Sequence, residues 1–94
     1  LGGEILIEKG VTVKIKDGFH PRIAAQFVKG LIQYDCKVEF YKNRRYVNPK
    51  NILQLTAASI KENDEIEVHV NGRDEKEVME YIEKFLSGEK GKAE

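Results

Sequence analysis

The stretch Gly18–Ala25 reads Gly-Phe-His-Pro-Arg-Ile-Ala-Ala and lies where the pattern of the chain changes from strand-like to helix-like. Gly18 marks a turn, and Pro21 suits the first position inside a helix, where a backbone N–H would have no partner. His20 is therefore the expected N-cap or its neighbour, with Arg22 two residues away. A helix N-terminus attracts anions through free N–H groups and a partial positive charge. The stretch therefore predicts a site that takes up a phosphoryl group and holds its charge.

The hydrophobic pattern on either side of this stretch predicts four strands and three helices. Alternating apolar residues indicate strands over 11–16, 37–42, 45–48 and 65–70. Apolar residues at helical spacing indicate helices over 21–33, 52–56 and 75–86. Asn51 and Asp74 are the expected caps of the second and third helices. Because alternating strands bury only one face, this order predicts a two-layer α+β sandwich.

The length of 94 residues predicts one domain with a single core. We expect a leader or a short extra strand over 1–10, the domain over 11–87, and a polar tail over 88–94. Sixteen basic and sixteen acidic residues cancel, which argues against a binder of nucleic acid or of anionic membranes. No apolar run is long enough for membrane insertion. The lone Cys36 has no partner for a disulfide, so a reducing, cytoplasmic location is expected.

The other residues that could carry a function are more simply interpreted as surface or structural residues. His69 alternates with glutamates on the outward face of a strand, so we expect a solvated surface histidine. Cys36 has no histidine at metal-ligand spacing and is interpreted as a lone thiol. The acidic residues around Asp64 lack the spacing of a calcium loop. The sequence therefore predicts neither a metal site nor a cofactor.

Three motifs together resemble HPr, the histidine-containing phosphocarrier family of the bacterial sugar phosphotransferase system. The resemblance extends over about residues 11–86. The motifs are Gly18-Phe19-His20 followed by Arg22 and Ala24; Val47-Asn48 with Lys50; and Gly72 with acidic residues leading into the last helix. The resemblance implies an open-faced β-sandwich, in which two long helices and one short helix cover one face of a four-stranded antiparallel sheet.

The resemblance also implies a function. In this family enzyme I, using phosphoenolpyruvate, phosphorylates the histidine that His20 matches, and the phosphoryl group passes to sugar-specific permease components. Arg22 matches the arginine that helps to hold the phosphate. Such a protein is a stoichiometric carrier and not a turnover enzyme. The residues implied in docking of partner proteins are Phe19, Ala25, Lys29, Ile52 and Leu53.

Three departures from the family pattern keep an alternative open. Pro21 replaces the usual alanine or threonine and supplies no N–H to a phosphate. Ile23 stands where the family usually has proline. Asn51 replaces a serine that a regulatory kinase phosphorylates in many Gram-positive members. The alternative is an HPr-like regulatory module that binds a regulator or metabolic enzyme with reduced or no phosphoryl transfer.

Overall fold

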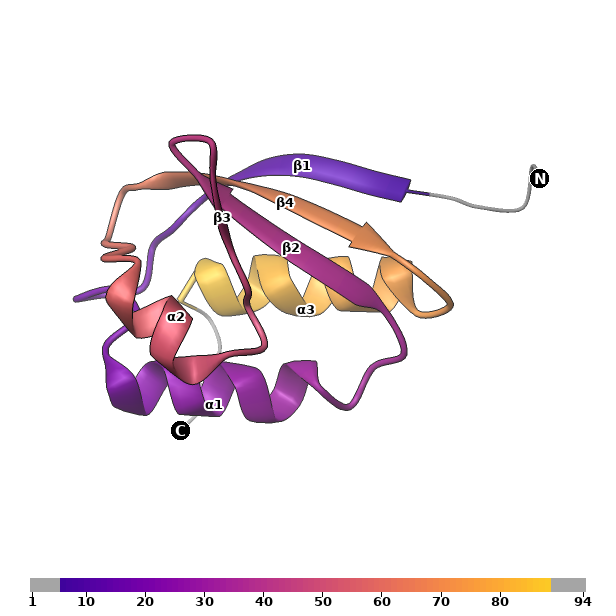
Figure 1. Ribbon diagram of the computed structural model, residues 1–94, viewed down its shortest axis with the longest axis horizontal. Helices are drawn as coiled ribbons and strands as arrows, with labels where there is room; N and C mark the ends of the chain where they lie inside the picture. The colour runs from indigo at the N-terminus through magenta and orange to yellow at the C-terminus, as the bar shows by residue number, and fades with distance from the viewer. Residues whose placement is uncertain (1–5, 89–94) are drawn as a thin grey trace.

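The computed structural model describes residues 6–88, which form four strands and three helices (Figure 1). In chain order the elements are β1 (Leu6–Thr12), α1 (Pro21–Leu31), β2 (Lys37–Lys42), β3 (Arg45–Val47), α2 (Ile52–Ala57), β4 (Glu65–Asn71) and α3 (Glu75–Leu86). All paired strands are antiparallel, and their order across the sheet is β1-β4-β2-β3. No helix within residues 6–88 has the length and apolar character needed to cross a membrane.

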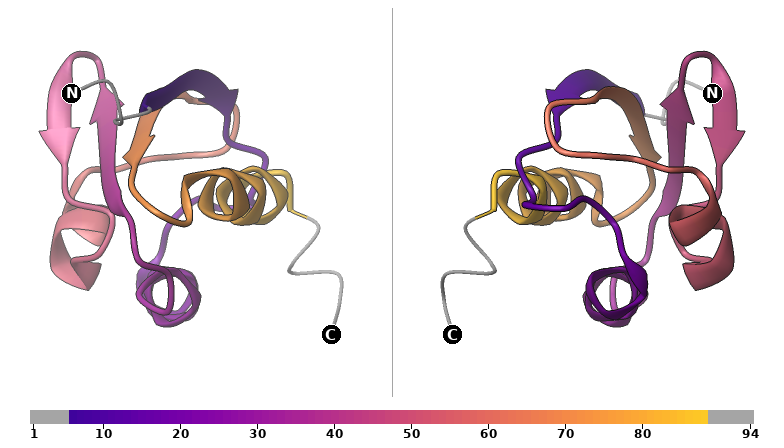
Figure 2. Two further views of the ribbon diagram at one scale, coloured as in Figure 1. Left: turned by 90° about the vertical axis from the view of Figure 1, so that its right-hand side faces the viewer. Right: turned by 90° about the vertical axis from the view of Figure 1, so that its left-hand side faces the viewer.

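The three helices lie on one side of the sheet and leave its other side open (Figure 2). The inward residues of the two central strands, among them Phe40, Val68 and Val70, are fully buried. They meet the apolar stripes of the helices, which include Phe27, Leu31, Ile82 and Phe85. This arrangement confirms the predicted α+β open-faced sandwich.

The first strand differs from the prediction of 11–16. It runs over Leu6–Thr12 and pairs along its whole length with β4. Val13 and Ile15 are buried, as their alternation predicts. However, the N–H of Val13 donates to the carbonyl of Asp64 at 2.8 Å, so the chain has left the sheet and joined a loop. A buried alternating pattern thus extends past the hydrogen-bonded ladder, and sequence alone does not separate the two.

The structure describes only part of the two terminal segments for which boundaries are expected. Residues 6–10 form the first part of β1. Residues 1–5 and 89–94 lie outside the described residues, so the boundaries expected there stay predictions.

Helix α1 ends at Leu31, two residues before the predicted end. The N–H of Gln33 donates to the carbonyl of Gly30, three residues back, which tightens the chain into a turn. Gly30 also allows close packing, because a Cβ there would overlap the hydroxyl of Tyr81 on α3. That hydroxyl donates to the carbonyl of Phe27 at 2.9 Å, and burial raises the pKa of Tyr81 to about 12. The glycine therefore weakens α1 locally and joins it closely to α3.

The predicted tight turn between β2 and β3 is confirmed. Asn43 and Arg44 both have positive φ, 51° and 68°, as a two-residue hairpin turn requires.

The two predicted helix caps, Asn51 and Asp74, differ in their hydrogen bonds. Asn51 accepts a hydrogen bond from the N–H of Gln54, as expected, whereas the Asp74 side chain makes no cap hydrogen bond. Its carboxylate accepts instead from the N–H of Asp35 at 2.7 Å.

Candidate functional site

The loop before α1 is held against the segment that follows α2. Gly18 has a φ of +69°, and a Cβ at this position would overlap the carbonyl oxygen of Ile60. The next N–H, that of Phe19, donates to the same oxygen at 3.1 Å. Only glycine has no side chain to interfere with this approach and adopts this backbone conformation without strain. The contact with Ile60 therefore sets the position of His20.

Phe19 anchors the loop in the core. Its side chain is only 4% exposed. Its ring lies edge-on to Phe27, with centroids 5.2 Å apart, and stacks with Phe85 at 6.3 Å. The side chain expected to dock partners is therefore not part of the exposed surface. It fixes the backbone next to His20 instead.

His20 is the N-cap of α1, as predicted. Its backbone is extended, with φ −77° and ψ 167°, and its carbonyl accepts from the N–H of Ala24 at 2.9 Å. The imidazole makes no capping hydrogen bond, and the residue is partly exposed. Among the described residues, no hydrogen bond or ion pair engages the ring. The side chain therefore has no structural task at this helix end.

The first turn of α1 carries no acidic residue. Pro21 occupies the first helical position and has no N–H to offer, so the free donors of the helix end begin with Arg22 and Ile23. The Arg22 side chain is exposed, two residues from His20. The partial positive charge of the helix end is thus left without a local carboxylate. The arrangement suits an anion attached to or bound beside the imidazole.

An exposed apolar pair lies on the neighbouring short helix. Leu53 is 80% exposed and Ile52 39% exposed; both begin α2, whose buried residue is Leu55. Helices α1 and α2 contact each other, and Figure 1 shows α2 alongside α1. Ala25 and Lys29 are exposed on α1. The fold thus carries these four predicted docking residues on two adjacent helices.

The remaining candidates differ in environment. Cys36 is buried, and this burial raises the pKa of its thiol and makes it a poor nucleophile. His69 is on the open face of the sheet as predicted, but its side chain is only 21% exposed and lies among three glutamates. The strand register creates this environment, and sequence alternation does not show it.

Comparison with known proteins is consistent with this geometry. A family model described as the PTS HPr component phosphorylation site matches residues 7–88. The chain belongs to the HPr family. The HPr-like protein Crh of Halalkalibacterium halodurans is 33% identical over 84 residues, which are 89% of this chain and all of that protein. The phosphocarrier protein HPr of Buchnera aphidicola subsp. Baizongia pistaciae is 26% identical over 87% of this chain and 96% of its own.

Solved structures of the HPr family share the fold. The crystal structure of phosphocarrier protein HPr from Bacillus anthracis has a TM-score of 0.81 at 26% identity, over 86% of this chain and 96% of its own. The crystal structure of the catabolite repression protein Crh from Bacillus subtilis has a TM-score of 0.71 at 28% identity. That match covers 88% of this chain and 95% of Crh. Both HPr and Crh are therefore among the relatives of the chain.

Proposed function

We propose that His20 of this HPr-family protein accepts a phosphoryl group, which originates in phosphoenolpyruvate, from an enzyme I-like donor. The protein then passes the group to sugar-specific components of a cytoplasmic phosphotransferase system. The observation that carries the proposal is the free imidazole at the N-terminus of α1. It is partly exposed, makes no capping hydrogen bond and stands at a helix end without acidic residues.

The chemistry follows from this placement. A neutral ring nitrogen of His20 attacks the phosphorus atom with its lone pair and forms an N–P bond. The bond between phosphorus and the donor breaks, and its electron pair leaves with the donor group. The product is a phosphohistidine, whose anionic oxygens the Arg22 guanidinium and the positive end of α1 stabilise. Pro21 removes one backbone donor, so the N–H groups of Arg22 and Ile23 supply the main-chain contribution.

Docking uses the exposed surface of α1 and α2. Leu53 and Ile52 supply its apolar part, and Ala25 and Lys29 extend it along α1. An exposed apolar pair next to a reactive group is typical of a protein-binding surface. Phe19 does not contribute its ring, since that ring lies in the core.

Incubation with phosphoenolpyruvate and an enzyme I-type donor tests the proposal. The intact protein should gain the mass of one phosphoryl group, and the bond should be labile in acid and stable in base. His20→Ala should abolish the gain. The chain has only two histidines, so His69→Gln is the matched control and should keep it. Absence of the gain with both a cognate and a generic donor would refute phosphoryl acceptance.

A regulatory module is the second candidate function. Two observations favour it: relatives named HPr-like protein Crh, one of them 33% identical, and the missing N–H at Pro21. On this alternative the α1–α2 surface binds a transcription factor or metabolic enzyme without phosphoryl transfer. Equal binding of such a partner by wild type and His20→Ala would support it. Dependence of every interaction on phosphorylated His20 would rule it out.

A further inference from the structure

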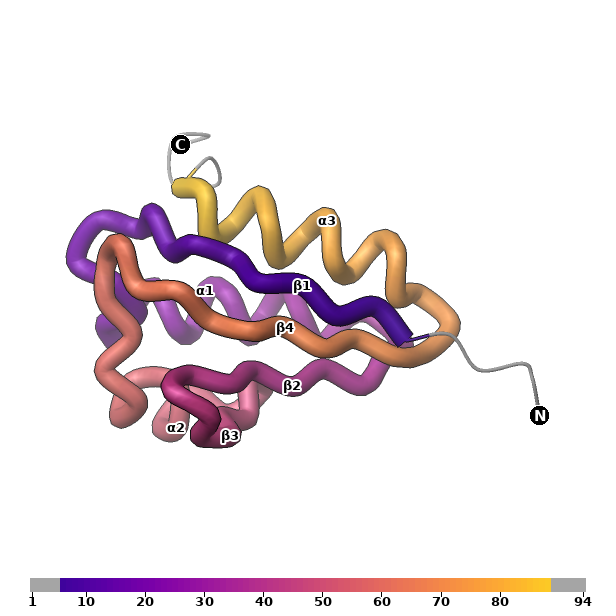
Figure 3. The backbone as a smooth tube through the Cα atoms, turned by 90° about the horizontal axis from the view of Figure 1, so that it is seen from above, coloured from indigo at the N-terminus to yellow at the C-terminus, as the bar shows by residue number. Residues whose placement is uncertain are grey.

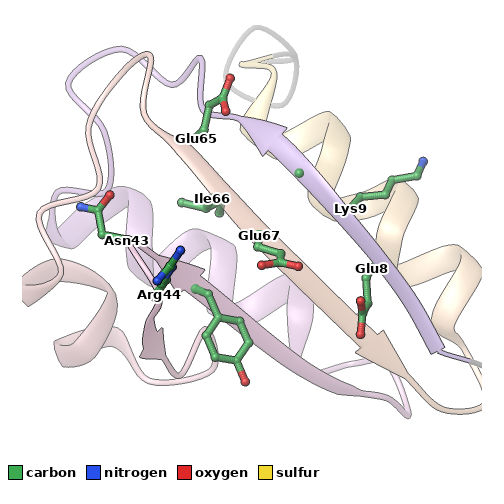
Figure 4. A pocket seen from close by; sticks show the side chains of 9 residues that line it. Glu8, Lys9, Asn43, Arg44, Glu65, Ile66 and Glu67 are labelled. Atoms are coloured by element: carbon green, nitrogen blue, oxygen red, sulfur yellow. The ribbon is translucent and has the colours of Figure 1, made fainter.

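The open face of the sheet brings together three glutamates and a histidine. His69 on β4 lies directly opposite Glu8 on β1 and Glu39 on β2, and Glu67 is two residues earlier on the same strand. Figure 3 shows β4 between β1 and β2 when the sheet is seen from above. The intervening Val68 is buried, so these four side chains project from the side that carries no helix. Figure 4 shows Glu8 and Glu67 on this face.

The ligand-type atoms of this cluster lie close together. The Nε2 atom of His69 is 3.1 Å from Oε2 of Glu67, and its Nδ1 atom is 3.7 Å from Oε2 of Glu8. One ligand atom each from Glu8, Glu67 and His69 can be chosen so that all three lie within 4.8 Å of one another. The three atoms come from two paired strands, whose backbone hydrogen bonds fix the spacing of the side chains.

The His69 imidazole is held in place, but one of its nitrogens lacks a hydrogen bond within the described residues. Its centroid is 4.9 Å from the ring of Tyr41, which supports it from β2. The Nε2 atom is buried and has no hydrogen-bond partner among the described residues, although the nearest Glu67 oxygen is at hydrogen-bond distance. The two atoms are thus close without the direction of a hydrogen bond. Two ligands of one metal ion can lie at such a distance without a hydrogen bond between them.

The carboxylates of the cluster differ in how they are paired. Glu39 accepts from the Tyr41 hydroxyl at 3.0 Å and lies 3.7 Å from Lys37 Nζ. Within residues 6–88, Glu8 and Glu67 lie close to His69 and form no ion pair with a lysine or arginine. Glu67 therefore lies beside the Nε2 atom of His69 and Glu8 beside the Nδ1 atom of the same ring, and within residues 6–88 neither carboxylate has a lysine or arginine partner. A divalent cation bound to one ring nitrogen of His69 and to one oxygen of each carboxylate would neutralise both glutamates.

We propose that Glu8, Glu67 and His69 bind a zinc ion on the open face of the sheet. An imidazole nitrogen with carboxylate oxygens is a zinc ligand set, whereas calcium and magnesium prefer oxygen alone. Zinc–ligand bonds of about 2.1 Å hold ligand atoms about 3.4 Å apart. The Glu8 and Glu67 side chains are 46% and 56% exposed, so they can move the short distance required. Water completes the coordination.

The ion would join β1, an edge strand, to the central strand β4. Binding only to the folded state raises stability by mass action, so zinc should raise the melting temperature. The site is on the face of the sheet opposite the helices, and His20 precedes α1 on the helix side (Figure 2). The zinc proposal therefore does not depend on phosphoryl transfer.

Calorimetric titration of tag-free protein with zinc chloride tests the site. Wild type should bind one zinc ion per chain and melt at a higher temperature with zinc. His69→Gln and Glu67→Gln should each weaken binding by about tenfold or more. Glu65→Gln is the matched control, because it makes the same charge change on the same strand and face. It should leave affinity unchanged, since Glu65 pairs with Thr12 and lies away from His69.

Three results would overturn the proposal: no zinc binding by wild type, binding that survives His69→Gln, or equal losses in Glu65→Gln and Glu67→Gln. Nitrogen NMR of histidine-labelled wild type provides a readout that does not rely on the folding of any variant. Zinc should shift the ring nitrogens of His69. A shift confined to His20, or no shift at either histidine, would also overturn it.

Discussion

Helices α1 and α2 begin in opposite ways. Both N-cap residues have extended backbones, with φ −116° for Asn51 and −77° for His20. The Asn51 side chain accepts from the N–H of Gln54 at 3.0 Å and so completes the start of α2. The His20 ring makes no such bond and leaves the start of α1 open. The completed end serves stability, and the open end has the donors and the charge to hold an anion.

The surroundings of the two starts reinforce the difference. Phe19, just before His20, is buried between aromatic rings, and Gly18 touches the Ile60 carbonyl. Tertiary contacts therefore hold the backbone at the open end in place, although its N-cap side chain makes no capping hydrogen bond. A reactive side chain must be positioned precisely, because misplacement of the reacting atoms lowers the rate of a transfer reaction.

His20→Asn should give the largest effect, since it converts the open end into a capped one. Acceptance of the phosphoryl group should be lost completely. The free energy of unfolding should rise by about 1 kcal/mol, because asparagine is among the best N-cap residues. The donor assay and urea denaturation measure the two quantities. Loss of both activity and stability would mean that His20 has a structural role, against the comparison.

Gly18→Ala should disturb the placement of the open end. The new Cβ would overlap the Ile60 carbonyl at a positive φ, which should cost at least about 2 kcal/mol of unfolding free energy. The rate of phosphorylation should fall as well. Gly10→Ala is the matched control, since no atom of residues 6–88 lies within 4 Å of a Cβ there. Equal stability of the two variants would show that the Gly18 contact does not hold the loop.

Asn51→Ala should affect only the capped end. Removal of the bond to the Gln54 N–H should lower the free energy of unfolding by about 1 kcal/mol. Phosphoryl acceptance by His20 should be unchanged. Asn51→Ser should recover most of the stability, because serine also caps. An acceptance rate that falls in Asn51→Ala and recovers in Asn51→Ser would show that the two helix ends are coupled.

The smallest expected effect is on the stability contributed by the loop between α2 and β4, and this effect depends on pH. The N–H of Lys61 donates to the Asp64 carboxylate, and Lys42 lies 3.0 Å from it; both lower the pKa of Asp64. A lowered folded-state pKa gives stability that is present above the ordinary pKa and is lost as the pH falls through the folded value. Urea denaturation should therefore show Asp64→Asn less stable than wild type at pH 7, with the difference shrinking in acid. A constant difference across pH would contradict this role.

The sequence predicts most of the fold because its patterns are local. Alternation identifies β2 and β4, and helical spacing identifies α3 with its observed bounds. The alternation misplaces β1, because the burial of Val13 and Ile15 continues the pattern beyond the last pair of residues between β1 and β4. The sequence therefore predicts buried faces better than strand ends.

The candidate site divides in the same way. His20 as N-cap follows from Pro21, a local signal. The burial of Phe19 depends on Phe27 and Phe85, and the environment of His69 depends on the register of three strands. Such long-range contacts leave no periodic trace in the sequence. The local part of the site is thus predictable, and the part made by tertiary packing is not.

Combined phosphorus and nitrogen NMR of histidine-labelled protein tests most directly whether the open end of α1 accepts a phosphoryl group. The protein is incubated with phosphoenolpyruvate and an enzyme I-type donor that phosphorylates a known HPr in parallel. We predict one phosphohistidine resonance and a change in the ring nitrogens of His20, with those of His69 unchanged. No resonance while the parallel HPr is phosphorylated, or a change at His69 instead, would contradict the assignment of His20.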